Sequence, residues 1–171
     1  MELWDRDVEP YAARLEALGG GALADLVLDA PASTIPLFEP QYDDFFPAAH
    51  RELIRSALHA RVRDPAGRRD DAEFARDFLS RYDVLPEVAV RPAVGPFMIA
   101  LVRLFEGGAP AASLSADDAL ECLSSCYEAL LLSQASGRAT IEDEERNRRC
   151  RQAIAVQTSL VLRALGSTTG P

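Results

Sequence analysis

Apolar residues recur at spacings of three and four along most of this 171-residue chain. That spacing places side chains on one face of an α-helix, whereas a half-buried strand would alternate apolar and polar residues. No sustained alternation competes with the helical pattern. The proline-containing segment 83–95 is expected to be an extended connector. The sequence therefore predicts an all-α protein.

The clearest elements are two amphipathic helices, predicted over residues 115–136 and 140–166. Ser115 and Thr140 are placed to cap their first turns, and acidic residues follow each cap. Gly166 is expected to end the second helix. Two long helices joined by a short loop form an antiparallel hairpin, which is the structure that we expect for residues 115–166.

Further helices are predicted before this hairpin, over residues 48–63, 70–82 and 97–105. The last is apolar nearly all round and is therefore expected to be the buried central helix. Together with shorter N-terminal runs, these segments predict a bundle of about six to seven helices in one domain, residues 1–166. The final residues, 167–171, are expected to form a flexible tail.

Negative charge is concentrated in the N-terminal part, residues 1–47, which holds ten acidic residues against Arg6 and Arg14, a net charge of −8. The whole chain carries −9 and contains no lysine. Without lysine there is no Walker phosphate loop and no Schiff-base chemistry. A net negative surface also repels nucleic-acid phosphates, so we expect no nucleic-acid partner.

The same N-terminal part places four of the twelve aromatic residues within residues 38–46, interleaved with acids. Such a loop is typical of a docking site for a basic protein, and equally of a segment that plugs the edge of a core. Aromatic residues anchor many interfaces. The candidate partner-binding residues are Trp4, Glu39, Tyr42, Asp43, Asp44, Phe45 and Phe46.

The first functional hypothesis is a non-catalytic protein that binds a protein partner, possibly basic, through this acidic and aromatic N-terminal third. Small acidic binders that cover basic toxins, such as immunity proteins and antitoxins, offer an analogy of class only. The scarcity of catalytic motifs favours this hypothesis over an enzyme, and no cofactor is expected. His50 and His59 point about 180° apart on one predicted helix, so they cannot share a metal through it, and no metal site is predicted.

Two alternatives remain open. An enzyme or small-molecule binder would use a pocket between helices, with Arg103, Glu121 and Glu128 as candidate pocket residues, because a charged residue on an apolar helix needs a partner when it is buried. A self-associating structural module would use the C-terminal hairpin, which is compatible with a homodimer.

Cys126 and Cys150 are predicted to lie at nearly the same height of the hairpin and are candidates for a redox pair. Nearby arginines would lower the pKa of the Cys150 thiol if it were exposed. Packing as small core residues is the other interpretation of these cysteines. An odd number of cysteines, an acidic N-terminus and apolar runs shorter than the ~20 residues of a membrane span predict a cytoplasmic protein with no membrane partner.

Overall fold

A computed structural model describes the chain except for residues 64–70, 87–90, 106–113, 135–136 and 167–171. All regular structure in the described residues is helical, which confirms the all-α prediction. In chain order the elements are α1 (Glu2–Asp7), the 3-10 turn η1 (Glu9–Tyr11), α2 (Ala12–Leu15), α3 (Gly20–Thr34), the 3-10 turn η2 (Ile35–Leu37), α4 (Tyr42–Phe45), α5 (Ala48–Arg63), α6 (Asp71–Asp83), α7 (Val94–Phe105), α8 (Ala116–Gln134), α9 (Ile141–Arg146) and α10 (Arg148–Gly166). The predicted tail, residues 167–171, lies outside the described residues.

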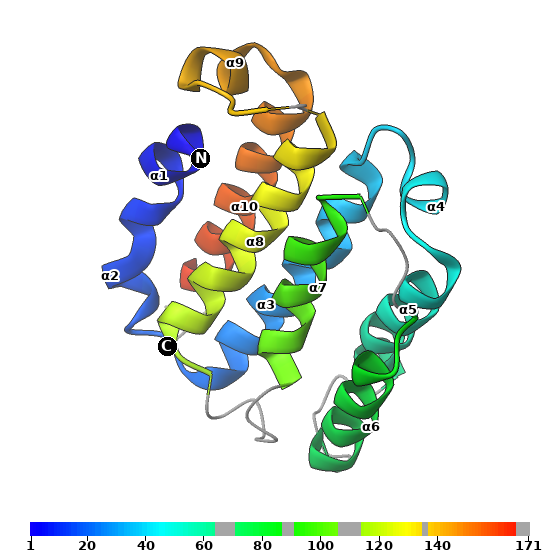
Figure 1. Ribbon diagram of the computed structural model, residues 1–171. Coiled ribbons are helices and arrows are strands. Elements are labelled where there is room, and N and C mark those ends of the chain that lie inside the picture. The colour runs from blue at the N-terminus through cyan, green and yellow to red at the C-terminus, as the bar shows by residue number, and fades with distance from the viewer. Residues whose placement is uncertain (64–70, 87–90, 106–113, 135–136, 167–171) are drawn as a thin grey trace.

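The bundle is organised around α8, which contacts α3, α7 and α10 (Figure 1). The buried face of α8 includes Leu123, Cys126 and Leu130, each with no exposed surface. The sequence predicted α7 as the buried central helix, and the structure confirms this in part. α7 packs against α8 and α3 and also contacts α5 and α6, but α8 occupies the centre and Ile99 of α7 is 44% exposed.

The C-terminal hairpin forms as predicted, with α8 and α10 running in opposite directions side by side (Figure 1). Ser115 caps α8, since its hydroxyl oxygen accepts a hydrogen bond from the Asp118 N–H at 3.1 Å. Thr140 caps α9 in a reciprocal arrangement with Asp143. The second arm is not continuous, however. It breaks at Asn147, whose side-chain oxygen accepts hydrogen bonds from the N–H groups of Arg149 at 2.8 Å and Cys150 at 3.2 Å and so begins a new helix.

The N-terminal segment, α1 to α2, lies along the C-terminal hairpin. Its first helix contacts α9 and α10, and α2 contacts α8 and α10 (Figure 1). Leu3, Val8 and Leu15 point into the core and are almost completely buried. The start of the chain is therefore fixed against residues more than 140 positions later.

The aromatic residues between 38 and 46 pack on the side of the bundle opposite the N-terminal segment (Figure 1). The Phe46 ring centroid lies 5.2 Å from that of Phe38 and 5.3 Å from that of Phe97, both with edge-on rings. Tyr42 stacks obliquely on Phe46 at 4.7 Å. Edge-to-face packing at these distances stabilises aromatic clusters beyond the burial of their area. The rings of Phe38, Phe45 and Phe46 therefore pack at the edge of the core.

Within the described ranges, no helix is both long enough and apolar enough to cross a membrane.

Candidate functional site

The predicted partner-binding residues fall into two groups in the structure. Trp4, Phe45 and Phe46 are only 3–6% exposed. They pack into the protein's own core because their rings, and the indole ring above all, bury more apolar area than other side chains do. The structure therefore corrects the prediction that these three side chains are available to a partner.

Tyr42 is half-buried, and its hydroxyl group is buried without a hydrogen-bond partner among the described residues. Burial raises the pKa of this tyrosine well above its usual value, with smaller opposing effects from Arg55 and Arg51. Because its hydroxyl group is buried, Tyr42 offers a partner less than the sequence predicted.

Glu39, Asp43 and Asp44 are exposed, as a partner site requires. Two of them are already engaged within the protein: Glu39 pairs with Arg149 at 3.0 Å, and Asp43 pairs with Arg51 at 3.2 Å. These pairs reduce the negative charge that the α4 region presents. Asp44 makes no ion pair with any described residue.

The N-terminal segment presents a different set of carboxylates, which the prediction did not single out. Glu2 and Asp5 lie three residues apart on one side of α1, and Glu9 begins η1. We call this set the acidic strip; it consists of Glu2, Asp5, Glu9 and Glu16. All four side chains are exposed, and none makes an ion pair within the described part of the chain. In Figure 1 the segment that carries them lies on the side of the molecule opposite α4.

A buried polar cluster fixes the segment that carries the acidic strip. The Glu144 side chain on α9 has no exposed surface. One carboxylate oxygen accepts a hydrogen bond from the backbone N–H of Glu2 at 3.1 Å, and the other accepts one from Leu3 at 3.2 Å. These N–H groups belong to the first turn of α1, where the helix itself supplies no acceptor. Glu144 thus caps α1 from a distant part of the chain.

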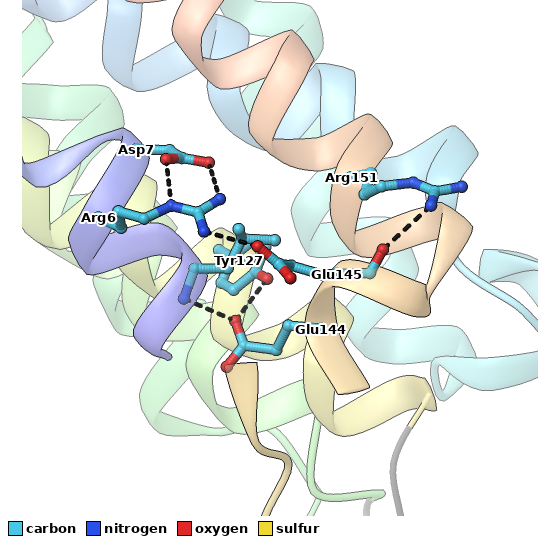
Figure 2. Close-up of polar contacts among 7 residues, drawn as sticks. Arg6, Asp7, Tyr127, Glu144, Glu145 and Arg151 are labelled. Carbon is cyan, nitrogen blue, oxygen red and sulfur yellow. Dashed lines mark hydrogen bonds and ion pairs between the residues drawn. The ribbon is translucent and has the colours of Figure 1, made fainter. Parts of the chain in front are cut away.

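Tyr127 completes the cluster from the central helix. Its hydroxyl group donates a hydrogen bond to Glu144 at 2.7 Å (Figure 2). Burial, followed by this hydrogen bond, raises the pKa of Tyr127 far above its usual value. Beside it, the Trp4 indole N–H donates to the Gln157 side-chain oxygen at 2.9 Å, and the Gln157 amide donates to the Leu123 carbonyl at 2.9 Å.

A second, exposed set of contacts lies outside this cluster. Arg6 contacts Asp7 at 2.7 Å and Glu145 at 2.6 Å, and so joins α1 to α9 (Figure 2). Arg151 donates a hydrogen bond to the Glu145 carbonyl at 3.0 Å. Asp7 is therefore neutralised locally and does not contribute to the acidic strip.

The residues predicted to line an interior pocket lie at the surface. Arg103 and Glu121 form an ion pair at 3.0 Å, but their side chains are 43% and 42% exposed. Glu128 is also exposed. The physical reason is the place of Arg103 in the last turn of α7, where it reaches solvent while it pairs with Glu121 on α8. These residues do not enclose a ligand, and the structure corrects that prediction.

The cysteines occupy the core. Cys122, Cys126 and Cys150 are free thiols with no exposed surface. Burial raises the pKa of the Cys150 thiol despite the arginines near it in sequence, and contact with Cys126 together with burial raises that of Cys122. The structure thus places the predicted redox pair, Cys126 and Cys150, in the packing role. No group of three or more histidine, cysteine or acidic side chains in the described residues is arranged to hold a metal ion.

Sequence reasoning did not identify Glu144 as the residue that anchors α1. It lies among four consecutive acidic residues, Glu142–Glu145, which were all attributed to the first turn of a helix. Nothing local distinguishes it, because its partners lie on α1 and α8. The burial of Gln157, by contrast, follows from helical spacing, since it lies three and four residues from the buried Ile154 and Val161 on α10.

Comparison of the chain with protein-family models, with curated proteins and with solved structures finds no match in any of the three.

Proposed function

We propose that this protein binds a basic protein partner through the acidic strip of its N-terminal segment. The observation that carries this proposal is that the four carboxylates of the strip are exposed and make no ion pair within the described residues. Surface acids on globular proteins commonly find a neighbouring arginine, as Glu39 and Asp43 do here. A strip without such neighbours has its charge available for another molecule.

The wider charge distribution supports the same proposal. Residues 1–47 carry a net charge of −8 out of −9 for the chain. The field of this net negative charge attracts a positively charged partner and speeds its association, in a manner that added salt suppresses. The same field disfavours nucleic acid as a partner.

The buried aromatic residues change the kind of interface that we propose. Since Trp4, Phe45 and Phe46 fill the core, the contact depends on charge more than on aromatic anchors. Asp44 is exposed but belongs to α4, which lies on the other side of the molecule (Figure 1), and it is a secondary contact at most. We infer a non-catalytic binding role of the kind that immunity proteins or antitoxins have, by analogy of charge alone, and a cytoplasmic location.

The test is capture of a basic partner from a lysate of the source organism by the immobilised protein. Wild type is compared with the variant Glu2→Gln/Asp5→Asn/Glu9→Gln. A matched control, Glu73→Gln/Asp77→Asn/Asp83→Asn, removes the same charge from three exposed positions of α6. The expected result is a basic protein that wild type and the control retain at about 50 mM salt, that the strip variant loses, and that about 500 mM salt releases.

Equal retention by both variants would contradict the proposed face. Loss in both variants would show that net charge alone matters and that no particular surface is used. Retention of acidic or neutral proteins that salt does not release would contradict the electrostatic basis of the proposal.

A further inference from the structure

The N-terminal segment, residues 1–18, packs on helices to which it is not directly joined. Its largest contacts with other helices are with α8, α9 and α10, whereas the chain continues from it into α3. In Figure 1 the segment lies along one side of the bundle and then turns back into α3. Each helix beneath it makes its own backbone hydrogen bonds, so the segment can leave their surface without breaking those bonds.

The segment is held by a small set of contacts and has little helical stability of its own. Glu144 accepts hydrogen bonds from the backbone of α1, and Gln157 accepts one from the Trp4 indole. Leu3, Trp4 and Val8 supply buried apolar surface. Helix α1 has six residues and α2 has four, far below the ~12–15 that an isolated helix needs in water. Undocking therefore also unfolds the segment, and the two events are one.

Three consecutive glycines, residues 19–21, join the segment to α3. Gly19 has an extended backbone, with φ of −74° and ψ of 154°, which other residues adopt readily. Neither Gly19 nor Gly21 has a left-handed φ, and a Cβ added at either position would meet no atom within 4 Å. Glycine in the first turn of α3 also lowers helix stability. The folded conformation does not require glycine at these two positions, and what glycine adds there is freedom of backbone rotation.

We propose that residues 1–18 form a strap that undocks as one unit, pivoting at residues 19–21, while α3 and the C-terminal hairpin stay folded. The acidic strip lies on this strap, so undocking releases its carboxylates from their fixed arrangement. A partner that binds the docked strip holds the strap closed, because a ligand shifts the equilibrium toward the state that it binds. The strap stands on its own, and only its effect on the partner face rests on the proposed function.

The experiment is native-state hydrogen exchange of the full chain at low urea concentrations, which measures the opening equilibrium of each backbone amide. Val8 and Leu18 report on the strap, since their N–H groups are hydrogen bonded within it at 2.8 Å and 2.9 Å. Leu123 reports on the core of α8. Val8 and Leu18 are expected to share one opening constant, about tenfold or more above that of Leu123. Their opening should also depend less on urea, because it exposes less surface.

A hinge variant tests the pivot. Gly19→Ser/Gly21→Ala restricts the backbone of the open state, while α3 is folded in both states, so the opening constant of the strap should fall about fivefold. The matched control is Gly95→Ala/Gly137→Ala, which replaces two other glycines whose added Cβ would meet no atom within 4 Å. The control should leave the opening constant of the strap unchanged.

Strap amides with the same opening constant as Leu123 would overturn the inference, since the segment would then open only when the whole protein unfolds. Equal effects of the hinge variant and the control would refute the pivot. A labelled arginine decapeptide separates the strap from the proposed function. Binding that slows exchange in the strap supports the coupling, and binding that leaves exchange unchanged refutes it. If the decapeptide does not bind while the strap opens on its own, the proposed partner face fails and the strap stands.

Discussion

The carboxylate of Glu144 accepts a 2.7 Å hydrogen bond from the hydroxyl group of Tyr127, and neither side chain has any exposed surface. A buried carboxylate is costly unless several donors surround it. Here the donors are the Tyr127 hydroxyl group and two backbone N–H groups of α1, and the Met1 amino group lies 3.9 Å away. The cluster therefore links the central helix, α9 and the N-terminal segment at a single point.

We expect Glu144→Ala to lower the free energy of unfolding by about 3–5 kcal/mol, because it leaves two buried donors and one partly buried donor without an acceptor. Urea denaturation followed by circular dichroism measures this change. The neighbouring variant Glu145→Ala, which removes an exposed carboxylate, should leave the midpoint close to that of wild type. Equal effects of the two variants would show that Glu144 has no special role in holding α1.

The pKa of Tyr127 is raised in the folded protein, so folding favours its protonated form. The stability from this shift is fully present below the unfolded-state pKa of about 10 and is lost as the pH rises above it. In that range, a tyrosine with a raised pKa lowers the free energy of unfolding by about 1.4 kcal/mol for each pH unit. Tyr127→Phe should therefore show a shallower loss of stability between about pH 10 and 11.5 than wild type does. An unchanged slope in urea titrations at these pH values would contradict the burial of this hydroxyl group.

The three thiols should not react in the native state. At pH 8, a disulfide reagent is expected to modify all three cysteines in about 8 M urea but none of them in native buffer over the same period, because they are buried. A Leu162→Cys variant, which places a thiol at a position that is 45% exposed, should react rapidly and serves as the control. Fast native modification of Cys150 would instead support the redox role that its neighbouring arginines suggested.

Asn147 should behave as a helix cap. Asn147→Ala removes the acceptor for the N–H groups of Arg149 and Cys150, and we expect it to cost about 0.5–2 kcal/mol of stability. Asn147→Asp keeps an acceptor at the same place and should stay close to wild type. Thermal melting of the three proteins tests this, and an alanine variant as stable as wild type would refute the capping role.

The sequence was informative where structure depends on near neighbours. The caps at Ser115 and Thr140 and the burial of Gln157 follow from spacing along single helices. The break at Asn147 was missed, although asparagine is a favoured cap, because apolar spacing continues across it and masks the interruption.

The candidate site was harder to predict because it depends on contacts between distant segments. Phenylalanines such as Phe45 and Phe46 occur both in interfaces and in cores, so their type alone does not show which they form. Their packing shows that they belong to the core, since Phe45 contacts Phe38 and Phe46 contacts Phe38 and Phe97. The acidic strip could be found from composition as part of a charged region. Its lack of ion-pair partners could not, since that depends on where the arginines of other helices lie.

The anchoring of α1 on residues 142 positions later in the chain has a consequence for biosynthesis. A ribosome adds about 5–20 residues per second, so roughly 7–30 s separate the synthesis of Glu2 from that of Glu144. During this interval Leu3 and Trp4 have no native partner on α9 or α10, and their apolar surface is open to chaperones or to other nascent chains. Residues of α1 are thus synthesised well before the residues that bury them, and the yield of folded protein should depend on how well the cell shields them in the meantime.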